Sequence, residues 1–482
     1  MPRDPRDRVS PPPALELDGR SLSLAEVVQV ACSHRPVALS HAAVERMRAA
    51  RAVVERVLER GHAVYGLTTA VGVRTSVRVG AGENAIFNAR LIADHRVGSG
   101  PDASEAVVRA TLVRLANGFA AGAAGVRPEL AERVVELLNA NDLPRVRLIG
   151  SVGMGDLAPM ADVGAHIADG FPLGAREGVA ILSTSSFSTA LAALALDRCD
   201  RYLTLQARLG ALELEALSAN VTMLHPAIAV ARPYPGIARV LERLHAALAG
   251  SFLWQPGAAR SLQDPLSFRD LPQILGAADD AVGFALSQLA IELNASTDSP
   301  LVLVEEDRVI STGNYDVLPL AQALDVARLA LGPVISSANE RTIKLMQSPH
   351  SGLADGLESG PGWGCALSEY VWAAQALATE ARLLVAPVSH ELGSASGAQG
   401  IEDRLTLAPL AARRLDEMLE LAGSLAAIQL VVAAQAVELR GSAPLGAETA
   451  ELVTLAREHV PFLAADSAIV PDIAPLAAAL ES

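Results

Sequence analysis

One short stretch restricts the fold of this chain more than any other: Gly150-Ser151-Val152-Gly153-Met154-Gly155-Asp156-Leu157-Ala158-Pro159. Its glycines allow positive φ angles that other residues avoid, so the stretch predicts a tight turn. The segments before and after it carry apolar residues at helical spacing. The sequence therefore predicts a glycine-rich turn inside a mostly helical chain.

The composition supports closely packed helices. Of 482 residues, 51% are hydrophobic and only 3% are aromatic, so alanine and leucine supply most of the core. This favours helices over sheets, which are typically richer in aromatic and β-branched residues. A chain of this length is long enough for two to four domains on the usual scale of ~100–200 residues each.

The charge balance limits the possible partners. A net charge of −15 argues against binding to nucleic acid or to an anionic membrane surface. The polar, proline-rich N-terminus is not followed by an apolar signal core, and the apolar run 425–437 is broken by Gln429 and Gln435. No metal-ligand spacing occurs among the ten histidines. We therefore expect a cytoplasmic protein without a membrane segment or a metal.

Three regions are expected along the chain. Residues 1–20 should be a disordered tail, because three consecutive prolines oppose a helix there. Residues 21–195 should form an N-terminal domain, with an amphipathic helix at 42–58 and a glycine-punctuated loop at 65–72. Residues 196–482 should form a helical bundle. Its long helices are expected at 279–293, 317–346, 368–385 and 405–439.

Four further motifs accompany the central turn. They are Glu292-Leu293-Asn294-Ala295-Ser296-Thr297-Asp298-Ser299-Pro300-Leu301, Gly313-Asn314-Tyr315, Gly400-Ile401-Glu402-Asp403 and Ala411-Ala412-Arg413-Arg414. In this order the motifs resemble the aromatic amino-acid ammonia-lyases, a family that includes histidine, phenylalanine and tyrosine ammonia-lyases and aminomutases. The resemblance runs from about Val28 to Ile473. It implies an all-α fold, with a smaller N-terminal domain that carries active-site loops and a long central helical bundle, and a homotetramer whose sites draw on three subunits.

The turn departs from the family at the decisive place. The family run reads Gly-Ser-Val-Gly-Ala-Ser-Gly-Asp-Leu-Ala-Pro, and its Ala-Ser-Gly cyclises and dehydrates into a methylidene-imidazolone electrophile, MIO. Here Met154 stands alone between Gly153 and Gly155, so the chain is one residue short and lacks the serine that supplies the methylidene carbon. The segment Gly153 to Asp156 is thus a degenerate cofactor segment, and we expect no MIO and no other cofactor.

The resemblance also assigns roles to individual residues. It implies that Tyr65 is a general base, that Glu402 faces the substrate amine and that His95 lies near the substrate ring. It assigns the substrate carboxylate to Arg269, next to a loop that includes Gln263, and it makes Asn314 a substrate-binding residue. Two pocket positions differ from the family pattern: Leu266 replaces a tyrosine, and Ser183 replaces an asparagine that bonds the MIO carbonyl.

Each of these residues also has a structural interpretation. A tyrosine is a poor base unless a positive charge or a focused field lowers its pKa, and its hydroxyl can simply bond a loop carbonyl. Arg269 could form an ordinary salt bridge, and His95 could be a hydrogen-bonded structural residue. Glu402 could belong to a solvated charge cluster with Asp403 and Arg404.

The changed positions all serve the electrophile, whereas those that serve the substrate are kept. Without MIO, a base that contributes ~10²–10⁴ cannot replace the missing activation of ammonia. We therefore expect an enzyme of specialised metabolism that acts on a small or unsaturated carboxylic acid through a tyrosine. The expected reaction is elimination of a better leaving group, isomerisation or conjugate-addition cyclisation. A catalytically inactive binding or partner subunit is the alternative, and a conventional ammonia-lyase is expected least.

Overall fold

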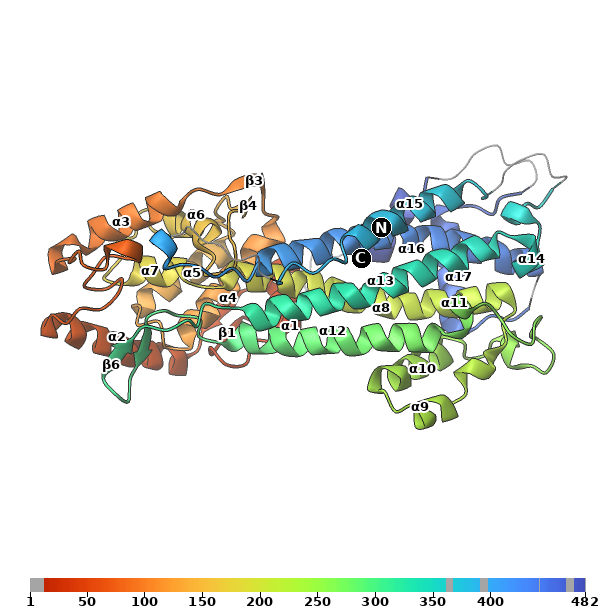
Figure 1. Cartoon of the computed structure of the whole chain (residues 1–482), viewed down its shortest axis with the longest axis horizontal. Coiled ribbons are helices and arrows are strands. Elements are labelled where there is room, and N and C mark those ends of the chain that lie inside the picture. Colours follow the sequence, from red (N-terminus) through yellow and green to blue (C-terminus); the bar gives the residue numbers. More distant parts are fainter. Residues whose placement is uncertain (1–12, 361–366, 391–397, 442, 465–471, 482) are drawn as a thin grey trace, which may run out of the picture. The chain divides into compact units, whose positions relative to one another are not determined.

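The computed structural model describes residues 13–360, 367–390, 398–441, 443–464 and 472–481. Helices account for 63% of the structure and strands for 5%, with no closed sheet in the described part of the chain, which confirms the all-α prediction (Figure 1). Two compact units are present. Unit 1 comprises Met1–Asp197, Leu286–Leu324 and Val388–Arg413, and unit 2 comprises Arg198–Ala285, Asp325–Pro387 and Arg414–Ser482. The sequence-based division after residue 195 supposes two continuous stretches, whereas these units are discontinuous.

Unit 1 is built from short helices and three small sheets. Strand β1 (Leu15–Leu17) pairs in parallel with β2 (Val37–Leu39), and two antiparallel pairs are β3 (Ser99–Asp102) with β4 (Arg147–Ile149) and β5 (Leu301–Leu303) with β6 (Arg308–Ile310). The helices are α1 (Leu24–Cys32), α2 (His41–Arg60), α3 (Asn84–His95), α4 (Glu105–Ala120), α5 (Pro128–Ala140), α6 (Leu157–Ile167) and α7 (Glu177–Leu182).

The expectation of a disordered tail through residue 20 is wrong for β1. Leu15 and Leu17 are buried, at 6% and 1% exposure, because their strand pairs with β2. Main-chain pairing with a distant segment stabilises these residues, and local composition gives no sign of it. Residues 1–12 lie outside the described part of the chain.

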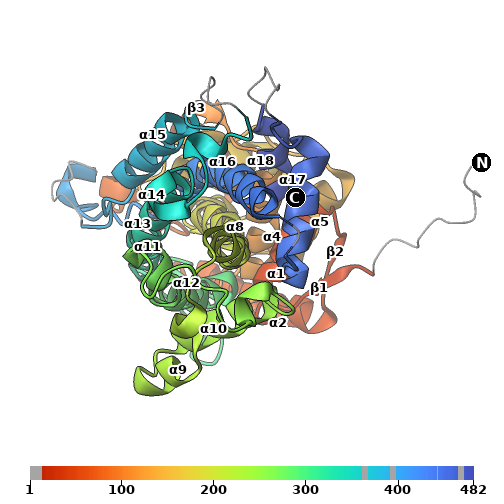
Figure 2. The same ribbon diagram turned by 90° about the vertical axis from the view of Figure 1, so that its right-hand side faces the viewer.

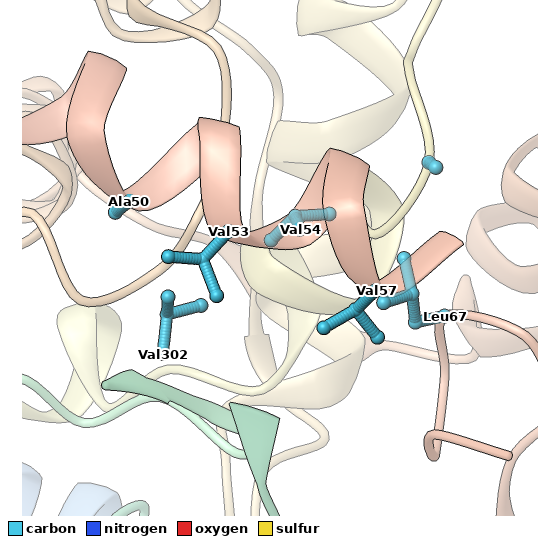
Figure 3. Close-up of a cluster of buried hydrophobic side chains, with 7 residues drawn as sticks. Ala50, Val53, Val54, Val57, Leu67 and Val302 are labelled. Atoms are coloured by element: carbon cyan, nitrogen blue, oxygen red, sulfur yellow. The ribbon is translucent and has the colours of Figure 1, made fainter. Parts of the chain in front are cut away.

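One apolar cluster fixes the loop that carries Tyr65. Ala50, Val53, Val54 and Val57 repeat at three- and four-residue intervals on α2, so they form one buried face (Figure 3). Leu67, two residues after Tyr65, packs into this cluster together with Ala175 and with Val302 of β5. The cluster thereby ties the start of the loop to α2 and β5.

Long helices dominate unit 2. The longest are α8 (Ser186–Leu217), α12 (Leu271–Asn294), α13 (Leu318–Leu345) and α16 (Ala408–Arg440), each with part of its length in unit 1. The predicted helices at 42–58, 279–293, 317–346, 368–385 and 405–439 correspond to α2, α12, α13, α15 and α16. The remaining helices are α9 (Ala227–Ala231), α10 (Pro235–Ala247), α11 (Leu266–Arg269), α14 (Ser348–Ser351), α15 (Tyr370–Leu383), α17 (Ala447–His459) and α18 (Ala474–Glu481).

Helix α8 is central among the unit 2 helices. Figure 2 shows it with α12, α13 and α16 around it. Gln206 of α8 donates to Gln429 of α16 at 2.9 Å, and Glu213 of α8 pairs with Arg341 of α13. Polar pairs between otherwise apolar helices fix how these helices face one another.

Four helical segments are long and apolar enough to cross a membrane by length and composition: Glu177–Leu217, Leu271–Asn294, Leu318–Leu345 and Ala408–Arg440. Length and composition alone therefore do not exclude a membrane span, although Gln429 and Gln435 interrupt the run 425–437. In the first and last segments, 89% and 83% of the apolar window is buried inside the protein, so packing between helices accounts for most of their apolar character.

Candidate active site

The glycine-rich stretch forms the predicted turn in unit 1. Gly153 and Gly155 have φ angles of 80° and 71°, in the left-handed region that favours glycine. A Cβ on Gly153 would lie only 2.1 Å from the hydroxyl oxygen of Thr406, so no larger residue fits there. Met154 between them forms a bridge with Asp316. The turn is thus held against two segments from much later in the chain.

The residues of the turn do not fit MIO. Between Gly153 and Gly155 stands Met154, which has no hydroxyl to dehydrate. The nearby hydroxyl of Ser151 donates to an Asp156 carboxylate oxygen at 2.7 Å and accepts from the Gly153 amide at 3.1 Å. Ser183 lies beside the turn as the resemblance implies, because a Cβ on Gly155 would be 3.4 Å from its Cα.

Asp156 is fully buried directly before α6. Its carboxylate accepts from the Ser188 amide at 2.7 Å and from the Ser188 hydroxyl at 2.6 Å, and the Asp156 amide donates to the Thr184 carbonyl at 2.7 Å. Burial raises the pKa of Asp156, and the hydrogen bonds from Ser188 and Ser151 partly oppose this rise. The hydroxyl-rich segment at the start of α8 therefore anchors the turn.

Tyr65 lies in a hydrogen-bonded loop. Its hydroxyl accepts a hydrogen bond from the Gly72 amide at 3.0 Å. The structural interpretation expected a bond to a loop carbonyl, and the hydroxyl bonds a loop amide instead. Burial raises the pKa of Tyr65, and the negative charge of Glu402 and the neighbouring Tyr315 phenol raise it further. Among the residues that the structure describes, no positively charged side chain lowers the pKa of Tyr65 to make it a good base. Tyr65 is consequently a neutral phenol at physiological pH.

Tyr315 and Glu402 join Tyr65 in an acidic group of side chains. Burial raises the pKa of Tyr315, with Glu402 and Asp316 adding to the rise. Glu402 is exposed, and no cation in the described part of the chain forms an ion pair with it. Arg404 instead lies 3.5 Å from Asp316. The structure thus brings Tyr65, Tyr315 and Glu402 together as an anionic, phenol-lined position suited to a cation.

His95 and Asn314 are bonded to other groups. The His95 Nδ1 lies 2.7 Å from the Leu91 carbonyl of its own helix, as the structural interpretation predicts. Asn314 is exposed, and its side-chain amide donates to the Ser296 carbonyl at 3.4 Å. No hydrogen bond links either side chain to Tyr65 or Glu402 within the described residues.

The arginine loop of unit 2 lines an open cavity of about 390 Å³. The Arg269 Nε lies 3.8 Å from an Asp270 carboxylate oxygen, too far for a hydrogen bond, and both side chains are more than a third exposed. The guanidinium is thus available for a ligand carboxylate, which it can bind through two parallel N–H groups. The structure brings Arg269 together with the predicted Gln263 and Leu266. The other lining residues are Leu217, Ser261, Asp264, Pro265, Pro349 and His350.

Three site residues were not predicted. Tyr315 stands next to Asn314 in a recognised motif, and that position was the available signal. Thr406 and Ser188 contact the turn from distant segments, and nothing in their local sequence indicates it.

The helical fold, the glycine-rich turn with its neighbouring tyrosines and the arginine loop define a helical protein of the ammonia-lyase type. The chain belongs to the aromatic amino acid lyase family, whose sequence model matches residues 22–171 and 166–458. Histidine ammonia-lyase of Anaeromyxobacter dehalogenans is 33% identical over 493 residues, which cover 95% of this chain and 97% of that protein. Histidine ammonia-lyase of Paracidovorax citrulli is 34% identical over 515 residues, with 98% and 99% covered.

Solved structures confirm the ammonia-lyase fold. Ergothionase from Treponema denticola, an ergothioneine-degrading enzyme, superimposes with a TM-score of 0.92 at 28% identity over 97% of this chain and 99% of that chain. Tyrosine aminomutase from Streptomyces globisporus gives 0.89 at 25% identity, with 97% of each chain covered. Members of this family act on small carboxylate substrates and are typically oligomeric.

Proposed function

We propose that this protein is an MIO-independent lyase that eliminates a permanently charged amine from a small carboxylic acid. The observation that carries the proposal is the position formed by Tyr65, Tyr315 and Glu402, beside a chain segment without the MIO serine. This position is negative, and among the described residues no cation forms an ion pair with Glu402. Carboxylates and aromatic rings are the groups that recognise quaternary ammonium ions. The similarity to an ergothioneine-degrading enzyme supports the same substrate class, because ergothioneine is an amino-acid betaine.

The proposed reaction needs no external electrophile. Glu402 binds the quaternary ammonium. The family resemblance assigns the substrate carboxylate to Arg269 and builds each site from three subunits. The substrate's positive charge lowers the pKa of Tyr65, so that the phenolate takes the β-proton. The C–H electron pair becomes the new double bond, the C–N bond breaks, and a neutral tertiary amine leaves with the bond's electrons. The product is an α,β-unsaturated acid.

Family resemblance supports a homotetramer with sites shared between subunits. A cytoplasmic location stays an expectation from the sequence, whose net charge is −15. Isomerisation or conjugate-addition cyclisation of an unsaturated acid would also use Tyr65 without MIO, but neither requires a cation at Glu402.

The test is a paired substrate panel. Betaines of histidine, tyrosine and phenylalanine, together with ergothioneine, are compared with the matching primary amino acids by the ultraviolet absorbance of the unsaturated product. We expect turnover of at least one betaine and none of its primary amine. Tyr65→Phe should lower turnover at least about tenfold, the low end of the contribution of a positioned base.

Two controls separate the alternatives. A bound carboxylate at about 100 times its Kd adds about 2.7 kcal/mol to the free energy of unfolding. Arg269→Ala should remove this stabilisation, and Arg269→Lys should restore only part of it, because lysine lacks the planar fork. Equal turnover of primary amino acids, or an intact mass reduced by lost water, would overturn the proposal. Absence of both binding and turnover would favour an inactive partner subunit.

A further inference from the structure

The degenerate turn keeps an elaborate set of contacts although it lacks the MIO serine. On one side, buried Asp156 bonds Ser151 and Ser188 at 2.6–2.7 Å. On the other side, the fully buried Thr406 donates its hydroxyl to the Gly153 carbonyl at 2.7 Å. These bonds lie in the protein interior, where leaving a polar group without its partner is costly. Such contacts indicate that the position of the turn itself matters.

The contacts of the turn lead to the two segments that carry Glu402 and Tyr315. The Leu407 amide donates to the Val152 carbonyl at 2.9 Å, which adds a main-chain bond beside that of Thr406. Leu407 has a φ of 57°, a conformation that costs energy for a branched residue and must be held by its surroundings. Thr406 and Leu407 follow Glu402 closely in the chain, so the turn restrains the backbone just after Glu402.

The second segment is held through Met154. Its bridge with Asp316 lies one residue from Tyr315. Asp316 in turn accepts from the Leu318 amide at 2.9 Å at the start of α13 and lies 3.5 Å from Arg404. One turn therefore touches both of the segments that supply the negative position, and Asp316 and Arg404 connect those segments directly.

We propose that the former cofactor turn is a platform that sets the position of Glu402 relative to Tyr65 and Tyr315, with Thr406 as its principal positioning residue. The inference rests on the proposed cation-binding role of Glu402. It explains why the glycines and Asp156 are kept without MIO: Gly153 must admit the Thr406 hydroxyl, and Asp156 must hold the other side of the turn.

The first test needs no ligand and so does not depend on the proposed function. Thr406→Val keeps the shape of the side chain but removes the hydroxyl, and Thr406→Ser keeps the hydroxyl. The ionisation of Tyr65 is followed by tyrosinate absorbance, with Tyr65→Phe identifying its part of the signal. We expect Thr406→Val to move the ionisation of Tyr65 to lower pH, because the Glu402 carboxylate no longer lies in place. Glu402→Gln should have the same effect, because it removes the charge. Thr406→Ser should match the wild type.

The double variant shows whether Thr406 acts through Glu402. Adding Thr406→Val to Glu402→Gln should cause no further shift of Tyr65. The inference would be overturned if the double variant showed a full additional shift in the ionisation of Tyr65. An unchanged ionisation of Tyr65 in Thr406→Val alone would overturn it as well. If Thr406→Val does not give folded protein, Thr406→Ala removes the same hydroxyl with less bulk.

The second test measures specificity. A betaine and its neutral isostere, in which carbon replaces the charged nitrogen, are titrated against each variant. Thr406→Val should weaken the binding of the betaine about tenfold, which corresponds to about 1.4 kcal/mol, and leave the affinity for the isostere unchanged. If Thr406→Val weakened the binding of both ligands equally, Thr406 would have only a structural role. Equal binding of both ligands to the wild type would instead overturn the proposed function, and the ligand-free test would still decide the role of Thr406.

Discussion

Replacing Arg341 by methionine should destabilise unit 2 strongly, because it leaves the carboxyl group of Glu213 buried without its ionic partner. The side chains of the pair are only 1% and 0% exposed. Burial raises the pKa of Glu213, and Arg341 is the main group that opposes this rise. Removing one partner of such a pair typically costs about 3–5 kcal/mol.

Arg341 also holds the arginine loop. Its Nη1 donates to the Ser267 carbonyl at 3.2 Å and to the Ser337 hydroxyl at 2.9 Å, and Ser267 lies in α11 with Arg269. Losing both bonds adds roughly 1 kcal/mol each, so we expect the free energy of unfolding to fall by about 5 kcal/mol or more. Urea unfolding followed by circular dichroism at matched protein concentration measures the change.

The matched control is Arg341→Met combined with Glu213→Leu, which removes both charges. Its stability should return to within about 2 kcal/mol of the wild type, because an apolar pair of similar size can replace a buried ion pair and only the two bonds to Ser267 and Ser337 stay lost. Ligand binding through Arg269 should stay impaired in the double variant, since the Ser267 carbonyl still lacks its donor. A single variant within about 0.5 kcal/mol of the wild type would refute this account of the pair.

Three further changes test other parts of the structure. Glu402→Gln should move the rising limb of kcat/KM to lower pH, because removing the negative charge lowers the pKa of Tyr65 in the free enzyme; an unmoved limb would contradict the proximity of the two groups. Val53→Ala should cost about 2 kcal/mol in urea unfolding, because it opens a cavity beside Val302. For Asp156, whose folded pKa lies above its usual 3.8, stability relative to Asp156→Asn should fall as pH rises from about that value; a constant difference would contradict the raised pKa.

Sequence periodicity was sufficient to predict the long helices. An apolar face repeated over many residues indicates a helix whatever it packs against, and α12, α13 and α16 follow this rule. Strand β1 escaped prediction because a three-residue strand owes its order to its partner β2. The same limit applies to Thr406, whose contact with Gly153 depends on the whole chain path between them.

Motif matches could name the site residues but not their electrostatics. The resemblance named Tyr65 as a base and Glu402 as a ligand of the substrate amine, without saying that the two lie close together. A tyrosine acts as a good base only when a positive neighbour lowers its pKa. The sign of that neighbour is a property of the folded chain, which places the Glu402 carboxylate and the Tyr315 phenol there instead. His95 was a motif match of the same kind, yet its ring bonds the Leu91 carbonyl within α3.

The negative position around Tyr65 limits the substrates that the proposed MIO-independent reaction can use. A substrate must be cationic to lower the pKa of Tyr65, which burial and Glu402 hold above its ordinary value near 10. A primary α-ammonium ionises at about pH 8, below the raised pKa of Tyr65, so it loses its charge before the phenolate forms. The resulting neutral amine is a poorer leaving group still. A quaternary ammonium has no proton to lose, keeps its charge at every pH and departs as a neutral amine, so the electrostatics of this site favour that class of substrate.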